Sequence, residues 1–234
     1  MHLFYVHDMR RTSVPSRDMN NSLRYHSVID KTILQWHALL EILFNKPITK
    51  RENPAKRLDK QIPLTHLEKK KSVGFMRVNH SGEVCAQALY RGHMVLSKNP
   101  TIRAMLAQAV EEEIDHLAWC QERVNELGGH VSYLNVFWYI NAFFIGFLTG
   151  FAGDHLSLGF VEETERQVEI HLANHLRKLP LTDIKSRKIL KQIQKDEIKH
   201  GEKAKSAGAK SLPHPVKKLM AFHAKVMSTL AYWI

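Results

Sequence analysis

The pattern Glu-x-x-His occurs twice in the chain, and both copies interrupt the apolar face of an expected helix. The segment EEEIDH places Glu113 three residues before His116, and the segment DEIKH places Glu197 three residues before His200. Residues at positions i and i+3 of an α-helix are neighbours on one face. Each carboxylate therefore projects beside its imidazole. One such pair alone would say little, because glutamate and histidine are common on helix surfaces.

The hydrophobic pattern around both pairs indicates that they are buried. Glu197 and His200 stand in line with Leu190 and Ile193 on one side and Ala204 on the other. The apolar stripe that contains Glu113 and His116 is made of Leu106, Ala109 or Val110, Leu117, Cys120, Val124 and Leu127.

Lone glutamates occupy the same kind of position in two other expected helices. Glu83 lies on the face of Met76 and Tyr90, and Glu165 lies on the face of Val161. Both are therefore expected to point inward. Three other glutamates near Glu165 fall mostly off its stripe: Glu162, Glu163 and Glu169.

Burying four carboxylates is costly unless a positive charge compensates them. Lysine and arginine lie mainly off these stripes, so a pair of metal cations would supply the missing charge. Carboxylate oxygens combined with imidazole suit iron or manganese better than zinc. Glu113 follows Glu83 by 30 residues, and Glu197 follows Glu165 by 32. This repeat matches the di-iron carboxylate bundle, in which two helices each supply a glutamate and two others each supply Glu-x-x-His.

The rest of the chain predicts an all-α fold, since no alternating strand pattern of useful length occurs. Gly128 and Gly129 are expected to end one long helix, and Asp183 or Thr182 to begin another. The expected elements are an N-terminal amphipathic helix at 27–45, helices at 66–98 and 101–127, an uncharged segment at 133–153 that can continue as one helix through 178, a helix from 182 or 183 to 207, and a closing segment at 214–234.

Composition excludes several classes of protein. With only Cys85 and Cys120, the chain can hold no disulfide framework, cysteine zinc site or thiolate iron–sulfur cluster. A net charge of +11 favours nucleic acid or an anionic membrane surface as a partner. Nucleic-acid motifs are absent, and the basic runs at 50–60 and 68–71 are interpreted as a solvated linker. A membrane surface is therefore the preferred partner.

Two segments bear on membrane contact. The uncharged segment 133–153 is long enough to span a bilayer, but one crossing would place the two Glu-x-x-His helices on opposite sides. We therefore expect a deeply buried or membrane-dipping helix. The closing segment fits an interfacial helix and an ordinary docking helix equally well. The N-terminus lacks the apolar stretch of a signal peptide, and Met19 is a candidate start because patterned sequence begins only after it.

The motifs around these glutamates resemble one known family, the demethoxyubiquinone hydroxylases. The similarity runs from about residue 25 to the C-terminus, and RVNHSGE and the two Glu-x-x-His segments are its most specific parts. It is carried by MRVNHSGEVCAQALYRGHM, EEEIDHLAWCQERVNELGG, GFVEETERQVEIHLANHLRKLP and DEIKHGEKAKSAGA.

The resemblance implies a ferritin-like four-helix bundle with an extra N-terminal helix and a C-terminal amphipathic helix. It implies an O2-dependent di-iron monooxygenase of ubiquinone biosynthesis, which hydroxylates the ring of demethoxyubiquinol. The family's metal ligands fall on Glu83, Glu113, His116, Glu165, Glu197 and His200. Glu162 is the alternative to Glu165, and His171 matches a recurrent histidine to which we assign either a supporting role beside the metals or none.

Further expectations follow for the partners and for the organisation of the chain. The cofactors are two iron ions, with electrons from an external reductant such as NADH or from the quinol itself, because no dinucleotide fingerprint is evident. The resemblance implies peripheral binding at the cytoplasmic face of a bacterial cell membrane, and self-association. We expect a disordered extension at 1–24, a helix and basic linker at 25–65 and the ferritin-like hydroxylase domain at 66–234.

Three other functions stay open at this point. A ferroxidase or iron store would turn over Fe(II) and O2 without a quinone. A lipid-binding or assembly protein would use its metals only to hold the fold. A quinone-linked oxidase would reduce O2 to water and leave the ring unlabelled.

Overall fold

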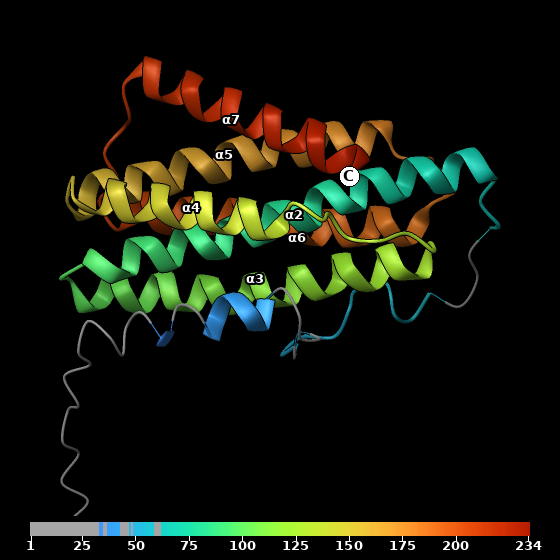
Figure 1. Cartoon of the computed structure of the whole chain (residues 1–234), viewed down its shortest axis with the longest axis horizontal. Coiled ribbons are helices and arrows are strands. Elements are labelled where there is room, and N and C mark those ends of the chain that lie inside the picture. The colour runs from blue at the N-terminus through green and yellow to red at the C-terminus, as the bar shows by residue number, and fades with distance from the viewer. Residues whose placement is uncertain (1–32, 35–36, 43–46, 48, 59–61) are drawn as a thin grey trace, which may run out of the picture.

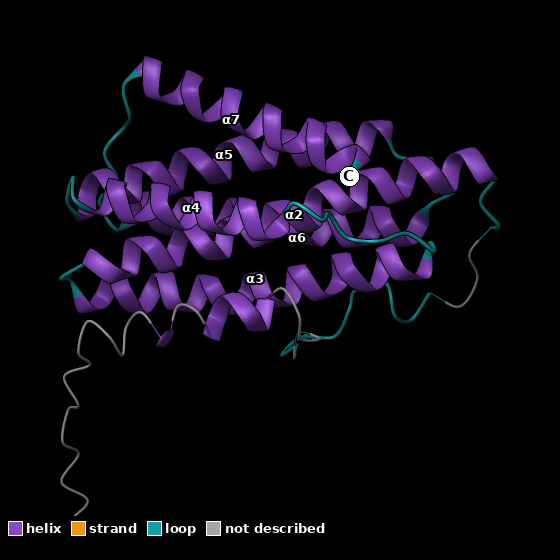
Figure 2. Cartoon of the chain, viewed as in Figure 1, coloured by secondary structure: helices purple, strands orange, loops and turns teal. Residues whose placement is uncertain are grey.

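The helices that carry the two Glu-x-x-His pairs and the two lone glutamates form the centre of the molecule. The computed structural model describes residues 33–34, 37–42, 47, 49–58 and 62–234, and this part of the chain contains helices and no strand (Figures 1 and 2). The all-α prediction is therefore confirmed. The six long helices are α2 (His66–Leu96), α3 (Pro100–Glu126), α4 (Asn135–Gly150), α5 (Asp154–Lys178), α6 (Ile184–Ser206) and α7 (His214–Trp233).

Helices α2, α3, α6 and α5 pack in a ring, each against the next, and α4 and α7 lie on its outside (Figure 1). Local sequence sets the ends of these helices. Thr65 and Glu68 form a capping box at the start of α2. Asp183 begins α6 by accepting a hydrogen bond from the amide of Ser186, and it also pairs with Arg123 of α3 at 2.7 Å. Thr182, the alternative N-cap, does not take this role.

The prediction that one continuous helix can run from 133 to 178 is wrong, because the chain turns between α4 and α5. Helix α4 ends at Gly150 and α5 begins at Asp154. Gly153 has a φ of 89°, a conformation that glycine adopts without the strain that a side chain would cause. This turn reverses the chain, so α5 enters the central ring while α4 stays packed along α2.

Helix α4 is neither deeply buried nor a membrane span. Its inner face, with Trp138 and Tyr139, packs on α2, whereas Phe137 and Phe144 on its outer face are more than half exposed. Among the residues that the structure describes, no helix has the length and apolar character needed to cross a membrane.

Most of the N-terminal region lies outside the described residues. This applies to the expected extension at 1–24 and to much of the helix at 27–45, of which 33–34 and 37–42 are helical. The division of the chain at residue 65 stays a prediction. The solvated-linker interpretation of 50–60 is wrong in part, because Ala55 is 3% exposed and packs in the main core and Arg51 reaches into the bundle.

The contact between α2 and α4 depends on glycine. A methyl group on Gly146 would overlap the carbonyl oxygen of Leu89, and one on Gly92 would overlap the carbonyl oxygen of Phe143. The two backbones therefore approach closely where α4 crosses α2. By contrast, a methyl group on Gly82 of α2 would meet no atom within 4 Å.

Two glycine-to-alanine changes should shift stability in opposite directions. Gly82→Ala should raise the free energy of unfolding by about 1 kcal/mol, because alanine favours a helix interior. Gly146→Ala should lower it by about 1–3 kcal/mol, because the added methyl group overpacks a backbone contact. Urea unfolding followed by circular dichroism measures both. Equal shifts in the two variants would contradict the close α2–α4 approach.

Candidate metal centre

Six side chains from four helices meet in the middle of the bundle. They form two groups whose ligand atoms lie within 4.8 Å of one another. Glu83 and His116 complete one group, and Glu165 and His200 complete the other. Glu113 and Glu197 belong to both groups. The arrangement therefore offers two adjacent metal positions with two carboxylates placed to bridge them.

These six residues are the six that the sequence singled out, and each is at most 5% exposed. The alternative Glu162 is half-buried and lies in neither group. His171 is also outside both groups, and its ring contacts that of His175 with 3.8 Å between centroids. The assignment of the six as metal ligands is a proposal that follows from this geometry, and a supporting role for His171 stays a prediction.

Each histidine turns one nitrogen toward the shared carboxylates. His116 Nδ1 lies 3.1 Å from Glu113 Oε2 and 3.2 Å from Glu197 Oε1. His200 Nδ1 lies 3.2 Å from Glu197 Oε2 and 3.3 Å from Glu113 Oε1. Nδ1 is therefore the atom that each ring presents to a metal ion.

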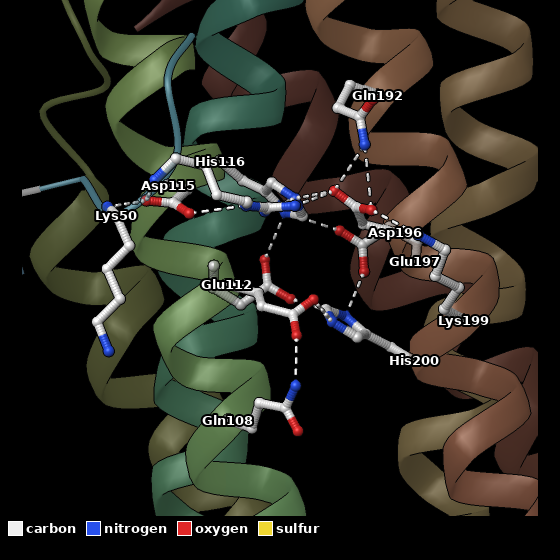
Figure 3. A network of polar contacts seen from close by, with 12 residues as sticks. Lys50, Gln108, Glu112, Asp115, His116, Gln192, Asp196, Glu197, Lys199 and His200 are labelled. Carbon is white, nitrogen blue, oxygen red and sulfur yellow. Dashed lines mark hydrogen bonds and ion pairs between the residues drawn. The ribbon is translucent and has the colours of Figure 1, made fainter. Parts of the chain in front are cut away.

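The other nitrogen of each ring meets a second carboxylate, as Figure 3 shows. His116 Nε2 lies 3.2 Å from Asp196 Oδ2, and His200 Nε2 lies 3.0 Å from Glu112 Oε2. With Nε2–H donated to these oxygens, loss of the Nδ1 proton would leave the lone pair of that nitrogen to a metal. Carboxylates commonly orient metal-binding histidines in this way.

The two orienting carboxylates are exchanged between helices. Asp196 precedes Glu197 on α6 but orients His116 of α3, whereas Glu112 precedes Glu113 on α3 but orients His200 of α6. Sequence reasoning missed both residues. The signal was present, because an acidic residue stands directly before each Glu-x-x-His.

Burial and mutual charge set the protonation of the cluster. Burial raises the pKa of Glu83 and of Glu165 well above the usual value. Burial lowers the pKa of His200, but the hydrogen-bonded carboxylates of Glu113 and Glu197 outweigh it and raise that pKa to about 12. Burial also lowers the pKa of His116, but its hydrogen bonds with Asp196, Glu113 and Glu197 outweigh burial and raise that pKa.

The resulting charge state tests whether metals fit. Burial opposes ionisation of Glu113 and Glu197, yet their contacts with the histidines lower both pKa values. Two imidazolium rings, two carboxylates and two neutral carboxylic acids sum to zero charge. Two divalent cations would replace four protons and leave the charge unchanged. Glu165 Oε1 is also buried without a hydrogen-bond partner among the described residues, so the donor set fits a metal pair.

The two ends of the cluster have different surroundings. Beside His200 lies a small, mainly apolar cavity of about 10 Å³, room for about one water molecule. Beside His116 lie the guanidinium group of Arg51 and the ring of Trp119. The lining of the cavity comprises Tyr90, Met105, Leu106, Ala109, Val161, His200 and Lys203.

Comparison with known proteins shows which family the sequence matches. The family described as "Ubiquinone biosynthesis protein COQ7" matches residues 70–231, which include all six cluster residues. A protein named 3-demethoxyubiquinol 3-hydroxylase from Coxiella burnetii (strain Dugway 5J108-111) is 67% identical over 216 residues, covering 92% of this chain and 100% of the relative.

Relatives of the same name occur in other bacteria. That of Polynucleobacter necessarius subsp. necessarius is 48% identical over 208 residues, 89% of this chain and 100% of its own. That of Cupriavidus metallidurans is 48% identical over 207 residues, 88% of this chain and 100% of its own. The family profile covers more than half of the sequence, and its match holds the whole carboxylate–histidine cluster. The chain therefore belongs to the COQ7 family of ubiquinone biosynthesis proteins.

Proposed function

We propose that this protein is a 3-demethoxyubiquinol 3-hydroxylase that acts in ubiquinone biosynthesis. The observation that carries the proposal is the buried cluster of four carboxylates and two histidines in a chain 67% identical to proteins of that name. In the overall reaction a ring C–H bond becomes C–OH and the second oxygen atom of O2 leaves as water. Two electrons enter from an external reductant such as NADH or from the quinol itself, and the two protons come from that donor and, for NADH, also from solvent.

The six residues of the cluster would bind two iron ions. Glu83 and His116 would hold one ion and Glu165 and His200 the other, while Glu113 and Glu197 are shared by both groups. Iron bound in this way supplies the reduction of O2 on which hydroxylation depends. Asp196 and Glu112 would accept hydrogen bonds from the Nε2–H groups of His116 and His200. Each ring would then hold its proton on Nε2 and present Nδ1 to the metal ion.

The apolar surroundings and two buried polar side chains would position the quinol. Leu106 and Val161 beside the cluster are at most 3% exposed and exclude bulk water. Gln87 and Tyr90 follow Glu83 by one and two turns of α2, on the same inward face. The Gln87 amide and the Tyr90 hydroxyl are buried and have no hydrogen-bond partner in the described part of the chain. They are suited to bind the ring oxygens of the quinol.

An isotope experiment tests this function. Protein loaded anaerobically with iron should receive a short-tailed demethoxyubiquinol, a reductant and 18O2, and mass spectrometry should find one 18O on the ring. Glu165→Gln should reduce labelled product at least about 100-fold, because changes in groups that only orient metal ligands already cost about 10–100-fold and Glu165 is proposed as a ligand itself. Glu162→Gln, a change in a neighbouring glutamate outside the cluster, should leave labelling unchanged.

Two other outcomes would overturn the proposal. Consumption of O2 with two irons bound and an unlabelled quinone would indicate a ferroxidase or an oxidase. Equal loss of labelling in Glu162→Gln and Glu165→Gln would contradict the assignment of the cluster.

We propose further that the protein binds the cytoplasmic face of the cell membrane through α4 and α7. Both helices lie on the outside of the bundle (Figure 1), and His223 of α7 contacts Asn141 of α4 at 3.0 Å. Helix α7 also carries Lys217, Lys218 and Lys225, which suit anionic headgroups. The exposed apolar side chains are Val136, Phe137, Ile140, Phe144 and Leu148 on α4 and Leu219, Phe222, Val226, Leu230 and Trp233 on α7. Self-association, also expected from the family, is a separate proposal.

A paired substitution tests the membrane proposal. Phe144 and Phe222 are 58% and 65% exposed, so their replacement by glutamate should not disturb the core. Each change should remove about 1.5–3 kcal/mol of lipid contact, and the double variant should lose at least about tenfold in binding to vesicles of anionic phospholipid. Sedimentation with the vesicles measures the bound fraction. Leu181→Glu, in the exposed turn between α5 and α6, is the control, and an equal loss there would contradict the assignment of this face.

A further inference from the structure

Arg51 joins the N-terminal segment to one half of the candidate metal centre. Its Nε lies 2.8 Å from Asp115 Oδ2 on α3, and its Nη1 lies 2.7 Å from Asp196 Oδ2 on α6. Its Nη2 lies 3.2 Å from His116 Nε2. Residue 51 precedes the stretch 70–231 that the family profile matches.

Asp115 fixes the place of this arginine in the bundle. It is 2% exposed, and its Oδ1 accepts hydrogen bonds from the backbone amides of Lys50 at 2.7 Å and Arg51 at 3.4 Å. Its other oxygen binds the Arg51 side chain. The guanidinium also lies 4.9 Å from the centre of the Trp119 ring, within the range of a cation–π contact. Backbone, side chain and stacking therefore hold the group in one orientation.

The guanidinium shares a single oxygen atom with His116. Asp196 Oδ2 accepts from Arg51 and lies 3.2 Å from His116 Nε2. The remaining partners of Asp196 are Gln192 at 3.2 Å and the more exposed Lys199 at 3.4 Å. Without Arg51, this carboxylate could rotate toward those two partners and away from the imidazole.

The other half of the centre has no matching arginine among the described residues. Glu112, which orients His200, is bound by Gln108 at 3.0 Å and lies 3.6 Å from Lys203 Nζ. Its side chain is 23% exposed, whereas that of Asp196 is 3% exposed. The six candidate ligands are arranged in two similar halves, but the residues that contact Asp196 and Glu112 differ between these halves.

We propose that Arg51 is a positioning residue that holds Asp196 against His116 and so makes the two metal positions unequal. The inference rests on the metal centre of the proposed function and concerns only its His116 half. A guanidinium suits this role because its planar fork binds two carboxylates in fixed directions. Loss of a group that orients a metal-binding histidine typically weakens metal binding about 10–100-fold.

Cobalt binding tests this proposal without the need for turnover. Full-length protein would be titrated with Co²⁺ against a chelator, with the visible absorption of bound Co²⁺ as a second signal. Arg51→Gln should weaken one of two binding steps about 10–100-fold and alter the spectrum of that ion alone. Arg57→Gln is the matched control, since Arg57 lies in the same segment, contacts Glu52 at 3.1 Å and is 84% exposed.

Two more variants separate positioning from general stability. Arg51→Lys should restore affinity only in part, because lysine keeps the charge but not the fork. In an Asp196→Asn background, Arg51→Gln should cause little further loss, since Arg51 acts through that carboxylate.

Three results would count against the inference. Two unchanged binding steps in Arg51→Gln would overturn it. An equal loss of affinity in both Co²⁺ binding steps, together with a lower melting temperature, would overturn it. That result would mean that Arg51 only stabilises the fold. A wild-type protein that binds no metal pair would overturn the metal centre itself, and the inference with it.

Discussion

The charge balance inside the bundle is the constraint on which the rest of the structure depends. Four carboxylates and two imidazoles occupy positions that are at most 5% exposed, where an uncompensated charge is costly. Four protons or two divalent cations balance the cluster equally well. The pKa directions of the metal-free cluster therefore leave no net charge among these six side chains.

Residues that contact the two histidines from outside the cluster fix the orientation of their rings. Asp196 and Glu112 contact the histidines of each other's helices, so α3 and α6 are linked at both candidate metal positions. Arg51 binds Asp196 on the His116 side, while the small cavity lies on the His200 side. The nearly symmetric set of candidate ligands therefore has different neighbours at its two ends. Arg51 covers the His116 end, and mainly apolar residues line the His200 end.

Helical periodicity was sufficient to predict the bundle and to select the six cluster residues, because both follow from positions within single helices. It failed where distant segments meet. Arg51 lies in a run of charges that is typical of solvent, and its partner Asp196 is 145 residues away. Glu163 falls off the inward stripe of α5 but is buried, with Lys217 of α7 at 3.2 Å and Arg166 and Gln167 bound to its carboxylate. The turn at Gly153 was overlooked because the uncharged segment before it allows a longer helix.

Metal titration by calorimetry tests the charge balance most directly. Apoprotein at pH 7 would be titrated anaerobically with Fe²⁺ in buffers of different ionisation enthalpy, which reports the protons released. The account predicts two ions bound and about four protons released, two from the imidazolium rings and two from the carboxylic acids, because ligands must be deprotonated. Binding of two ions without proton release, or of one ion only, would contradict it.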